Sequence, residues 1–338
     1  MLKVVLDVMG ADKGITEIIK GVNEALNLDA ELGVVLCGDK DALSPVLAEL
    51  KTDSSRIEII DAKEVITNDD SPTTSFRTKT DSSVVKGLNA LKTRDDLCGF
   101  ISAGSTGAVL TAATFIIGRI KGIYRPTLAA QLPTADGKIV SIVDCGANVD
   151  SKVEYLPQYA MMGSIYMNSV YGVESPRVGL VSVGTEDSKG NELTKAVFPL
   201  LQAMPINFAG NMEARDTLSG QYEVLVCDGF VGNILLKSTE GTAKMMSGQV
   251  KAAVKSRIWS KLAYVLFMRG AFKKLKKTMD YHAMGGAPLL GLEKIVIKCH
   301  GSANSVAIKT ALLQTLKMTR GGLVEKIRAG VVSDKSEQ

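Results

Sequence analysis

The stretch "FISAGSTGAVLTAATF", residues 100–115, lies in the longest uncharged run of the chain, which extends from Leu97 to Gly118. A membrane-spanning helix needs about 20 predominantly apolar residues, and this run is long enough. It also contains four glycines, two serines and three threonines, which insert poorly into lipid. Because buried strands of parallel sheets are near-continuous apolar runs, the run predicts a strand at Cys98 to Ala103, a loop at Gly104 to Gly107, and a helix from about Ala108.

The composition is that of a soluble globular protein. The 338 residues are 46% hydrophobic and 22% charged, enough for one large or two fused α/β domains. The first residues include Asp7 and no small-residue cleavage site, so no secretory signal is expected. The cysteines are far apart and mostly within apolar runs, which indicates reduced core thiols of a cytoplasmic protein and no zinc site. They are Cys37, Cys98, Cys145, Cys227 and Cys299.

Apolar strands and amphipathic helices alternate along the chain. The predicted strands, besides the one above, are Leu2 to Leu6, Gly33 to Cys37, Ile57 to Ile60, Ile139 to Val143, Val178 to Val183, Glu223 to Cys227 and Lys294 to Lys298. The predicted helices are Ile15 to Leu26, Asp41 to Leu50, Ser82 to Leu91, Leu156 to Tyr171, Glu192 to Ala203 and Asn304 to Lys317. This alternation predicts an open, mostly parallel sheet covered on both faces. We expect a single α/β catalytic unit over residues 1–330 and a flexible tail over residues 331–338.

Glycine and small polar residues follow six of the predicted strands. The segments are "DVMGAD" (7–12), "SAGSTGA" (102–108), "DCGAN" (144–148), "VGTEDSKGNE" (183–192), "CDGFVGN" (227–233) and "CHGSANS" (299–305). Ligands of open α/β sheets bind beyond the carboxyl ends of the strands. Glycine lets the backbone approach a ligand closely, and the N–H groups that begin the next helix attract an anion. The alternative is that each turn simply uses glycine and a capping residue.

Several catalytic motifs are absent from the sequence. It has no G-x-x-x-x-G-K-[ST], no G-x-G-x-x-G after a strand, no H-E-x-x-H and no G-x-S-x-G. Nucleoside triphosphate hydrolysis and ordinary dinucleotide binding therefore lose their best support. Only His282 and His300 are available for a Ser-His-Asp hydrolase, and nothing identifies a partner serine.

The ordered set "DVMGAD", "TKTDSS", "SAGSTGA", "DCGANVDSK", "GTEDSKGNEL", "VCDGFVGNILLK" and "GAPLLG…CHGS" closely resembles the acyl-acyl carrier protein:phosphate acyltransferases of bacterial phospholipid synthesis, from about Val4 to Ala311. The resemblance implies a homodimer with a Rossmann-like three-layer α/β/α fold, related to phosphotransacetylases and isopropylmalate-type dehydrogenases. It implies conversion of acyl carrier protein thioester and inorganic phosphate to acyl phosphate. We predict no cofactor and assign no metal site, and the sequence leaves open whether a metal helps to neutralise the phosphate. It also implies a cytoplasmic protein that associates peripherally with the membrane, with the downstream membrane glycerol-3-phosphate acyltransferase as a further candidate partner.

Two other functions remain open at this stage. One is a phosphotransacetylase-type enzyme acting on short acyl-coenzyme A, and the other is a non-catalytic module that binds acyl chains or acyl carrier protein. The chain also departs from the family pattern. It has Ser105 where Asn is usual, which keeps a polar group, and Thr80 where a second Lys is usual. The missing charge at Thr80 leaves Lys79 and Arg77 as the better candidates to hold phosphate.

The implied reaction needs no nucleophile from the protein, because phosphate supplies the attacking oxygen. Positioning and preorganised donors should account for much of the rate. We assign the Gly104 to Gly107 loop to phosphate or oxyanion contact, and expect the donors at the other strand ends to face the same crevice. The predicted catalytic residues are His300, Asp228, Lys189 and Asn233. The predicted phosphate or oxyanion contacts are Gly104, Ser105, Thr106, Gly107, Asn148, Asn191, Lys79, Arg77 and Ser302.

The proposed roles have simpler alternatives. His300 protonates the leaving thiolate or donates to the oxyanion, with Asp228 orienting it; alternatively His300 is a structural histidine and Asp228 or Asp144 caps a helix. Lys189 is alternatively a solvated loop residue. Cys227 and Cys299 are interpreted as buried thiols, since nothing in the sequence marks a lowered pKa.

The segment from Gly241 to Met279 has ten basic residues and no acidic one, so the chain's net charge of +4 would be 4 − 10 = −6 without it. Apolar residues recur there near helical spacing, which predicts a protruding basic amphipathic helix over about 241–282. Such a helix suits an anionic membrane or the acidic carrier protein; the alternative is a hairpin buried at a dimer contact. No nucleic-acid-binding motif accompanies it. The predicted membrane or carrier contacts are Arg257, Trp259, Lys261, Leu262, Val265 and Leu266.

Overall fold

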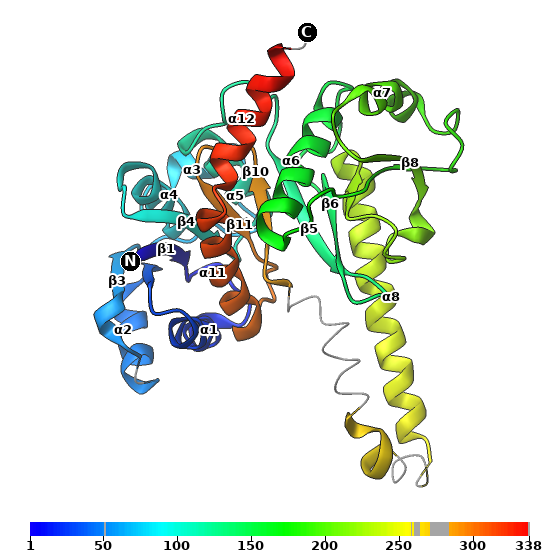
Figure 1. Ribbon diagram of the computed structural model, residues 1–338. Coiled ribbons are helices and arrows are strands. Elements are labelled where there is room, and N and C mark those ends of the chain that lie inside the picture. The colour runs from blue at the N-terminus through cyan, green and yellow to red at the C-terminus, as the bar shows by residue number, and fades with distance from the viewer. Residues whose placement is uncertain (51, 258, 260–263, 271–283, 337–338) are drawn as a thin grey trace.

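A computed structural model describes residues 1–50, 52–257, 259, 264–270 and 284–336. In this part of the chain, eleven strands form one sheet in the order β3-β2-β1-β4-β11-β10-β5-β6-β9-β7-β8 (Figure 1). The strands are β1 (Leu2–Asp7), β2 (Leu32–Gly38), β3 (Ile57–Asp61), β4 (Leu97–Ser102), β5 (Thr127–Pro133), β6 (Ile139–Val143), β7 (Val178–Ser182), β8 (Phe208–Glu213), β9 (Val224–Val226), β10 (Ala287–Leu290) and β11 (Ile295–Lys298).

The helices connect and cover these strands. They are α1 (Gly14–Leu28), α2 (Lys40–Glu49), α3 (Ser75–Thr78), α4 (Ser83–Thr93), α5 (Thr106–Ile116), α6 (Tyr155–Tyr171), α7 (Glu192–Ala203), α8 (Gly229–Lys255), α11 (Ser305–Arg320) and α12 (Leu323–Ser336). Short helical turns occur at η1 (Ser54–Arg56), η2 (Ala214–Asp216) and the π-helical η3 (Tyr264–Met268). The eight predicted strands and six predicted helices are all present, and no end differs from its predicted position by more than three residues. The sequence did not predict β5, β8 or β10.

The uncharged run around residues 100–115 folds as a strand, a loop and a helix. β4 ends at Ser102 and α5 begins at Thr106, two residues before the predicted start. No helix within the described ranges has the length and apolar character that crossing a bilayer requires.

The sheet contains two sets of parallel strands that run in opposite directions. β3, β2, β1, β4 and β11 form the first set, and β6, β9, β7 and β8 form the second. Between them, the β11–β10, β10–β5 and β5–β6 pairings are all antiparallel. Three reversals leave the two sets antiparallel to each other. The carboxyl ends of the two sets therefore lie at opposite edges of the sheet, although most strand pairings are parallel, as predicted.

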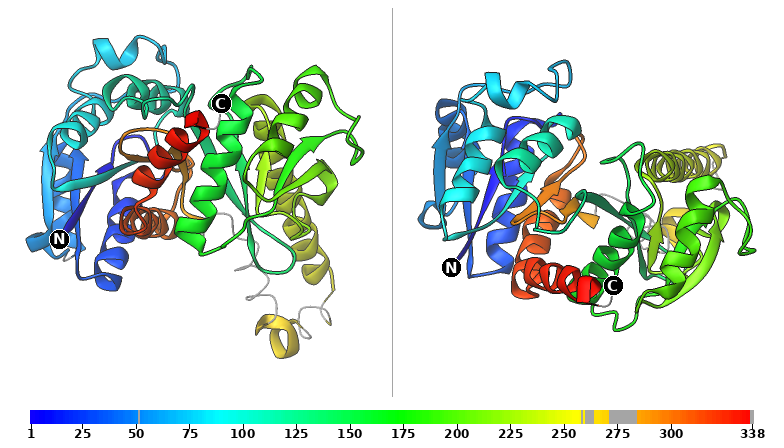
Figure 2. Two further views of the ribbon diagram at one scale, coloured as in Figure 1. Left: turned by 45° about the horizontal axis from the view of Figure 1, so that its top comes forward. Right: turned by 90° about the horizontal axis from the view of Figure 1, so that it is seen from above.

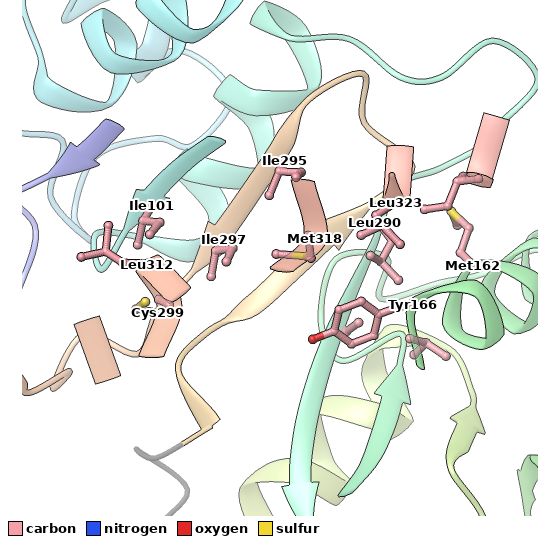
Figure 3. Close-up of a cluster of buried hydrophobic side chains, with 14 of the residues drawn as sticks. Ile101, Met162, Tyr166, Leu290, Ile295, Ile297, Cys299, Leu312, Met318 and Leu323 are labelled. Atoms are coloured by element: carbon pink, nitrogen blue, oxygen red, sulfur yellow. The ribbon is translucent and has the colours of Figure 1, made fainter. Parts of the chain in front are cut away.

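Helices cover both faces of the sheet, which gives the predicted three layers. One hydrophobic core contains α1, α6, α7, α11 and α12, and the other contains α4, α5 and α8; we call the face of the second core the α5/α8 face. β10, β11, α11 and α12, coloured orange to red, lie where the two halves of the sheet meet (Figure 2). Figure 3 shows Ile295 and Ile297 of β11 in the cluster that includes Leu312 and Met318 of α11.

The basic segment begins within a long helix. α8 has 27 residues, and its last buried residue is Leu235. Its C-terminal half projects from the body of the molecule (Figure 1), so the segment protrudes as predicted. Arg257 and Trp259 are exposed, whereas Lys261 and Leu262 lie outside the described residues, as do the side chains of Val265 and Leu266. α12 continues to Ser336, through most of the range predicted as a flexible tail.

Candidate active site

A cavity of about 370 Å³ lies on the α5/α8 face. α5 packs against α4 and β11, and α8 packs against β6. The strands between them, β10 and β5, contribute to the floor of the cavity. The lining residues used below are Gly10, Asp12, Gly104, Thr106, Leu128, Ala130, Leu132, Cys145, Asn233, Leu236, Lys237, Met284, Ala287, Lys298, Cys299, His300 and Gly301.

Two glycine-containing loops meet at one end of the cavity. Asp7, 1% exposed at the end of β1, accepts a hydrogen bond from Ser102 Oγ at 2.6 Å. The same Oγ accepts a bond from the Gly104 N–H at 3.0 Å. A Cβ on Gly10 would lie 2.4 Å from the Gly104 Cα, so only glycine permits this approach of the two backbones. The buried carboxylate of Asp7 thus fixes the position of the predicted anion loop.

The first turn of α5 faces the cavity. Gly104 and Thr106 line it, and the Ser105 hydroxyl, at the N-cap position, makes no hydrogen bond to the helix. The first N–H groups of a helix have no intrahelical acceptor and carry the positive end of its dipole. The N-terminus of this 11-residue helix is therefore suited to an anion.

Lys298 is a second positive group at this site. Its side chain reaches the cavity although the residue is only 7% exposed, and its Nζ donates to the carbonyl oxygen of Cys299. Burial lowers the pKa of the Lys298 ammonium below its ordinary value of 10.5. The negative charges of Asp7 and Asp12 act in the other direction and raise this pKa, but burial outweighs them. The sequence interpretation placed Lys298 in a strand but not in the site. The available signal was a lysine at the end of an apolar strand, directly before a polar glycine loop.

His300 lies in the loop that follows Lys298 and also lines the cavity. Its Nδ1 accepts a hydrogen bond from the Ser302 N–H at 3.1 Å and lies 2.8 Å from Ser302 Oγ. The Asp12 N–H donates to the Gly301 oxygen at 2.9 Å, which joins this loop to the loop after β1. The structure therefore brings Ser302, rather than Asp228, to the Nδ1 atom of His300.

The predicted site residues divide into those at the cavity and those away from it. Gly104, Thr106, Asn233 and His300 line it. Ser105 and Ser302 are in loops that line it, and Gly107 is in the first turn of α5. Asn233 belongs to α8, which lies across the cavity from α5. None of the other predicted residues is in the lining.

Three predicted residues have local structural roles near the strands of the second set. Asp228 caps α8 by accepting the Val231 N–H at 2.8 Å. Asn191 caps α7 by accepting the Thr194 N–H at 2.9 Å. Asn148 donates to the Pro126 oxygen at 2.8 Å and to Asp144 at 3.1 Å, where the buried Asp144 carboxylate also accepts backbone N–H groups.

The remaining three predicted residues carry positive charge. Lys189 is exposed in the loop after β7, in the second set of strands. The Lys79 Nζ lies 2.7 Å from Asp70, whose pKa it helps to lower to about 2, and the Arg77 guanidinium stacks over Phe76 and Phe115 at 5.2 and 5.6 Å. These contacts occupy Lys79 and Arg77 elsewhere, which leaves Lys298 as the buried cation at the cavity.

Two cysteines line the cavity, but their thiols are poor nucleophiles. Burial raises the pKa of Cys299 to about 12 and that of Cys145 well above its ordinary value. The thiolate is the reactive form of cysteine. The cavity therefore offers donors for an anion and no activated thiol.

The fold is shared with the phosphotransacetylases. The chain matches EutD phosphotransacetylase from Staphylococcus aureus with a TM-score of 0.60 at 17% identity, covering 94% of each chain. It matches a phosphotransacetylase from Streptococcus pyogenes with a TM-score of 0.59 at 17% identity, covering 96% of this chain and 94% of that one. The protein thus has the fold of the phosphotransacetylases.

Sequence comparison identifies the family. A family model described as "Fatty acid synthesis protein" matches residues 2–326. The phosphate acyltransferase of Bacillus pumilus is 47% identical over 314 residues, 93% of this chain and 92% of that protein. The phosphate acyltransferase of Clostridium perfringens strain ATCC 13124 is 44% identical over 328 residues, 96% of each. The chain belongs to the phosphate acyltransferase family, and it is an enzyme of that family.

Proposed function

We propose that the protein transfers a long acyl chain from acyl carrier protein to inorganic phosphate, releasing acyl phosphate and the carrier thiol. The observation that carries this proposal is the convergence of the α5 N-terminus and Lys298 on one cavity. Together they offer backbone donors and a buried ammonium to a phosphate. The family membership supports the same reaction.

The proposed reaction balances without a covalent enzyme intermediate. A phosphate oxygen attacks the thioester carbonyl carbon, and the carbonyl electrons move onto its oxygen. When the tetrahedral intermediate collapses, the C–S bond breaks and the thiolate leaves, taking a proton from His300 or from solvent. Lys298 and the first turn of α5 stabilise the charge on phosphate and on the carbonyl oxygen. The high pKa of both cavity thiols agrees with direct attack by phosphate.

The path of α8 supports a carrier protein as the acyl donor. Asn233, Leu236 and Lys237 line the cavity, and the same helix continues into the basic segment. An acidic carrier protein held on that segment would present its prosthetic arm beside the cavity. The fold shared with EutD phosphotransacetylase supports the second candidate function, in which short acyl-coenzyme A is the donor.

Hydroxylamine trapping of acyl phosphate tests the function. The protein is incubated with phosphate and either palmitoyl-acyl carrier protein or acetyl-coenzyme A, and the hydroxamate is measured. Product from the carrier protein alone supports our proposal, and product from acetyl-coenzyme A alone supports the second candidate. Absence of product from both would refute both proposed acyl donors.

We also propose that the protein is a cytoplasmic homodimer that binds the membrane surface through the basic segment. Trp259 and Phe267 are 77% and 83% exposed beside that segment's positive charges, a combination that suits an anionic bilayer. Replacing both by Glu should abolish pelleting with phosphatidylglycerol vesicles while soluble activity is kept. Leu200→Glu, an exposed apolar position on α7, is the matched control. Unchanged pelleting of the double variant would contradict membrane contact, and light scattering measures the oligomeric state.

A further inference from the structure

The floor of the cavity contains two alanines beside Lys298. Ala287 of β10 pairs with Lys298 of β11, and Leu289 of β10 pairs with Leu128 of β5. Extending the second, antiparallel register by two residues places Ala130 opposite Ala287. Residues directly opposite one another in neighbouring strands share a face of the sheet. Lys298, Ala287 and Ala130 therefore form a row across three strands, and all three line the cavity.

Larger apolar side chains enclose this row. Leu128 and Leu132 flank Ala130 on β5, and the three residues are between 3% and 7% exposed. Alternate residues of a strand point to the same face, so all three face the cavity. Leu236 of α8 and Met284 add to the apolar lining. One end of the cavity is thus suited to an anion, and the surface next to it is suited to hydrocarbon.

Neither a phosphate nor the amide groups of a pantetheine arm would gain from contact with this apolar surface, because both are polar. The acyl chain is the apolar part of the proposed substrates, and its first carbon is bonded to the carbonyl that phosphate attacks. With phosphate at the α5 N-terminus and Lys298, the first methylenes must lie close to Lys298. Ala287 and Ala130 have no side-chain atoms beyond Cβ, so they leave room there.

We propose that the Ala287–Ala130 row is the binding site for the first part of the acyl chain, and that these alanines let the enzyme accept long acyl groups. This inference rests on the proposed function, of which it specifies the acyl subsite. A leucine at either position would fill the space beside Lys298 and would leave the N–H groups of Gly104 and Thr106 unaltered. Acyl groups longer than acetyl would then be excluded, while phosphate would still bind.

Ala130→Leu and Ala287→Leu test the subsite. The value of kcat/KM is measured with acetyl-, octanoyl- and palmitoyl-acyl carrier protein at saturating phosphate. We expect the palmitoyl and octanoyl values to fall about tenfold or more relative to the acetyl value, with the KM for phosphate unchanged. Ala48→Leu, on the exposed surface of α2, is the matched control and should behave as wild type.

Each outcome decides the inference. If a leucine variant changes kcat/KM by the same factor for all three chain lengths, or leaves all three unchanged, the inference is overturned. Ala130→Val and Ala287→Val replace a leucine variant that does not fold. Calorimetric titration with palmitate is independent of turnover: weaker binding to Ala130→Leu than to wild type and Ala48→Leu supports the subsite, and equal binding overturns it. If wild type makes no acyl phosphate but palmitate binding still depends on Ala130, the proposed function fails and the subsite stands.

Discussion

Replacement of Lys298 by Met should separate stability from activity. The side chain is 7% exposed, and its Nζ donates to the Cys299 oxygen. Loss of that charged hydrogen bond costs about 1.5–3 kcal/mol, while removal of the buried charge recovers several kcal/mol of desolvation. Met fills a similar volume with an adaptable apolar chain. We therefore expect the free energy of unfolding to stay the same or to rise by about 1–4 kcal/mol.

Activity should change in the opposite direction. Removal of one preorganised donor from an oxyanion site lowers kcat about 10²–10³-fold, and we expect Lys298→Met to lose that much acyl phosphate formation. Phosphate at a hundred times its Kd should stabilise wild type by about 2.7 kcal/mol and the variant much less. Thermal melts with and without phosphate measure this difference, and Lys298→Arg should retain part of it because the positive charge remains.

The pH dependence of stability gives an independent readout. The folded-state pKa of Lys298 is lowered by burial, so the unfolded chain binds more protons between that pKa and 10.5. The free energy of unfolding of the wild type therefore increases as pH rises through this window. The Lys298→Met variant should not show this increase. A variant with wild-type kcat and wild-type stabilisation by phosphate would refute the assignment of Lys298 to the anion site.

Three further perturbations follow from the site and its surroundings. Ser105→Ala with Thr106→Val should raise the KM for phosphate about tenfold by removing two hydroxyls at the α5 N-terminus; steady-state kinetics with an unaltered KM would contradict the loop assignment. Asp7→Ala should lower the free energy of unfolding by about 1–3 kcal/mol in urea titrations, because the buried partners of the carboxylate lose their acceptor. A variant as stable as wild type would show that the carboxylate does not hold the loop. Burial alone would raise the pKa of Glu223, but hydrogen bonds and charge from Arg177 outweigh it and lower the pKa. That pair stabilises the fold above the unfolded pKa of about 4.5 and is lost as pH falls through the lower folded value, so Glu223→Gln should reduce stability at pH 7 more than at pH 3.

Apolar periodicity predicted the layers of the fold but not the direction of every strand. β10, "APLL", is only four residues long, and β5, "TLAAQLP", contains Gln131 and two alanines. Such segments carry too little apolar signal to be recognised as strands. Because the pairings of these two strands reverse the direction of the sheet, the sequence did not predict that the two sets of parallel strands run in opposite directions. The Gly104 loop was found because its glycines follow a strongly apolar strand.

Side-chain direction explains the other differences at the site. A lysine at a strand end such as Lys298 is usually solvated, and only its pairing with Ala287 reveals that it points toward the cavity. Asp228 and Asn191 were open to two interpretations, and the capping alternative is the one that the hydrogen bonds match. Sequence spacing cannot distinguish a cap from a ligand donor, since both need a polar side chain at the start of a helix.

The position of β11 ties the order of synthesis to the appearance of the site. This strand lies between β4 and β10, in the middle of the sheet, yet it is synthesised after the other ten strands. The earlier strands cannot join into one sheet until residues 295–298 are available. The same strand delivers Lys298, and His300 follows it directly. A nascent chain therefore has no complete cavity, and affinity for phosphate should arise only when the central sheet closes.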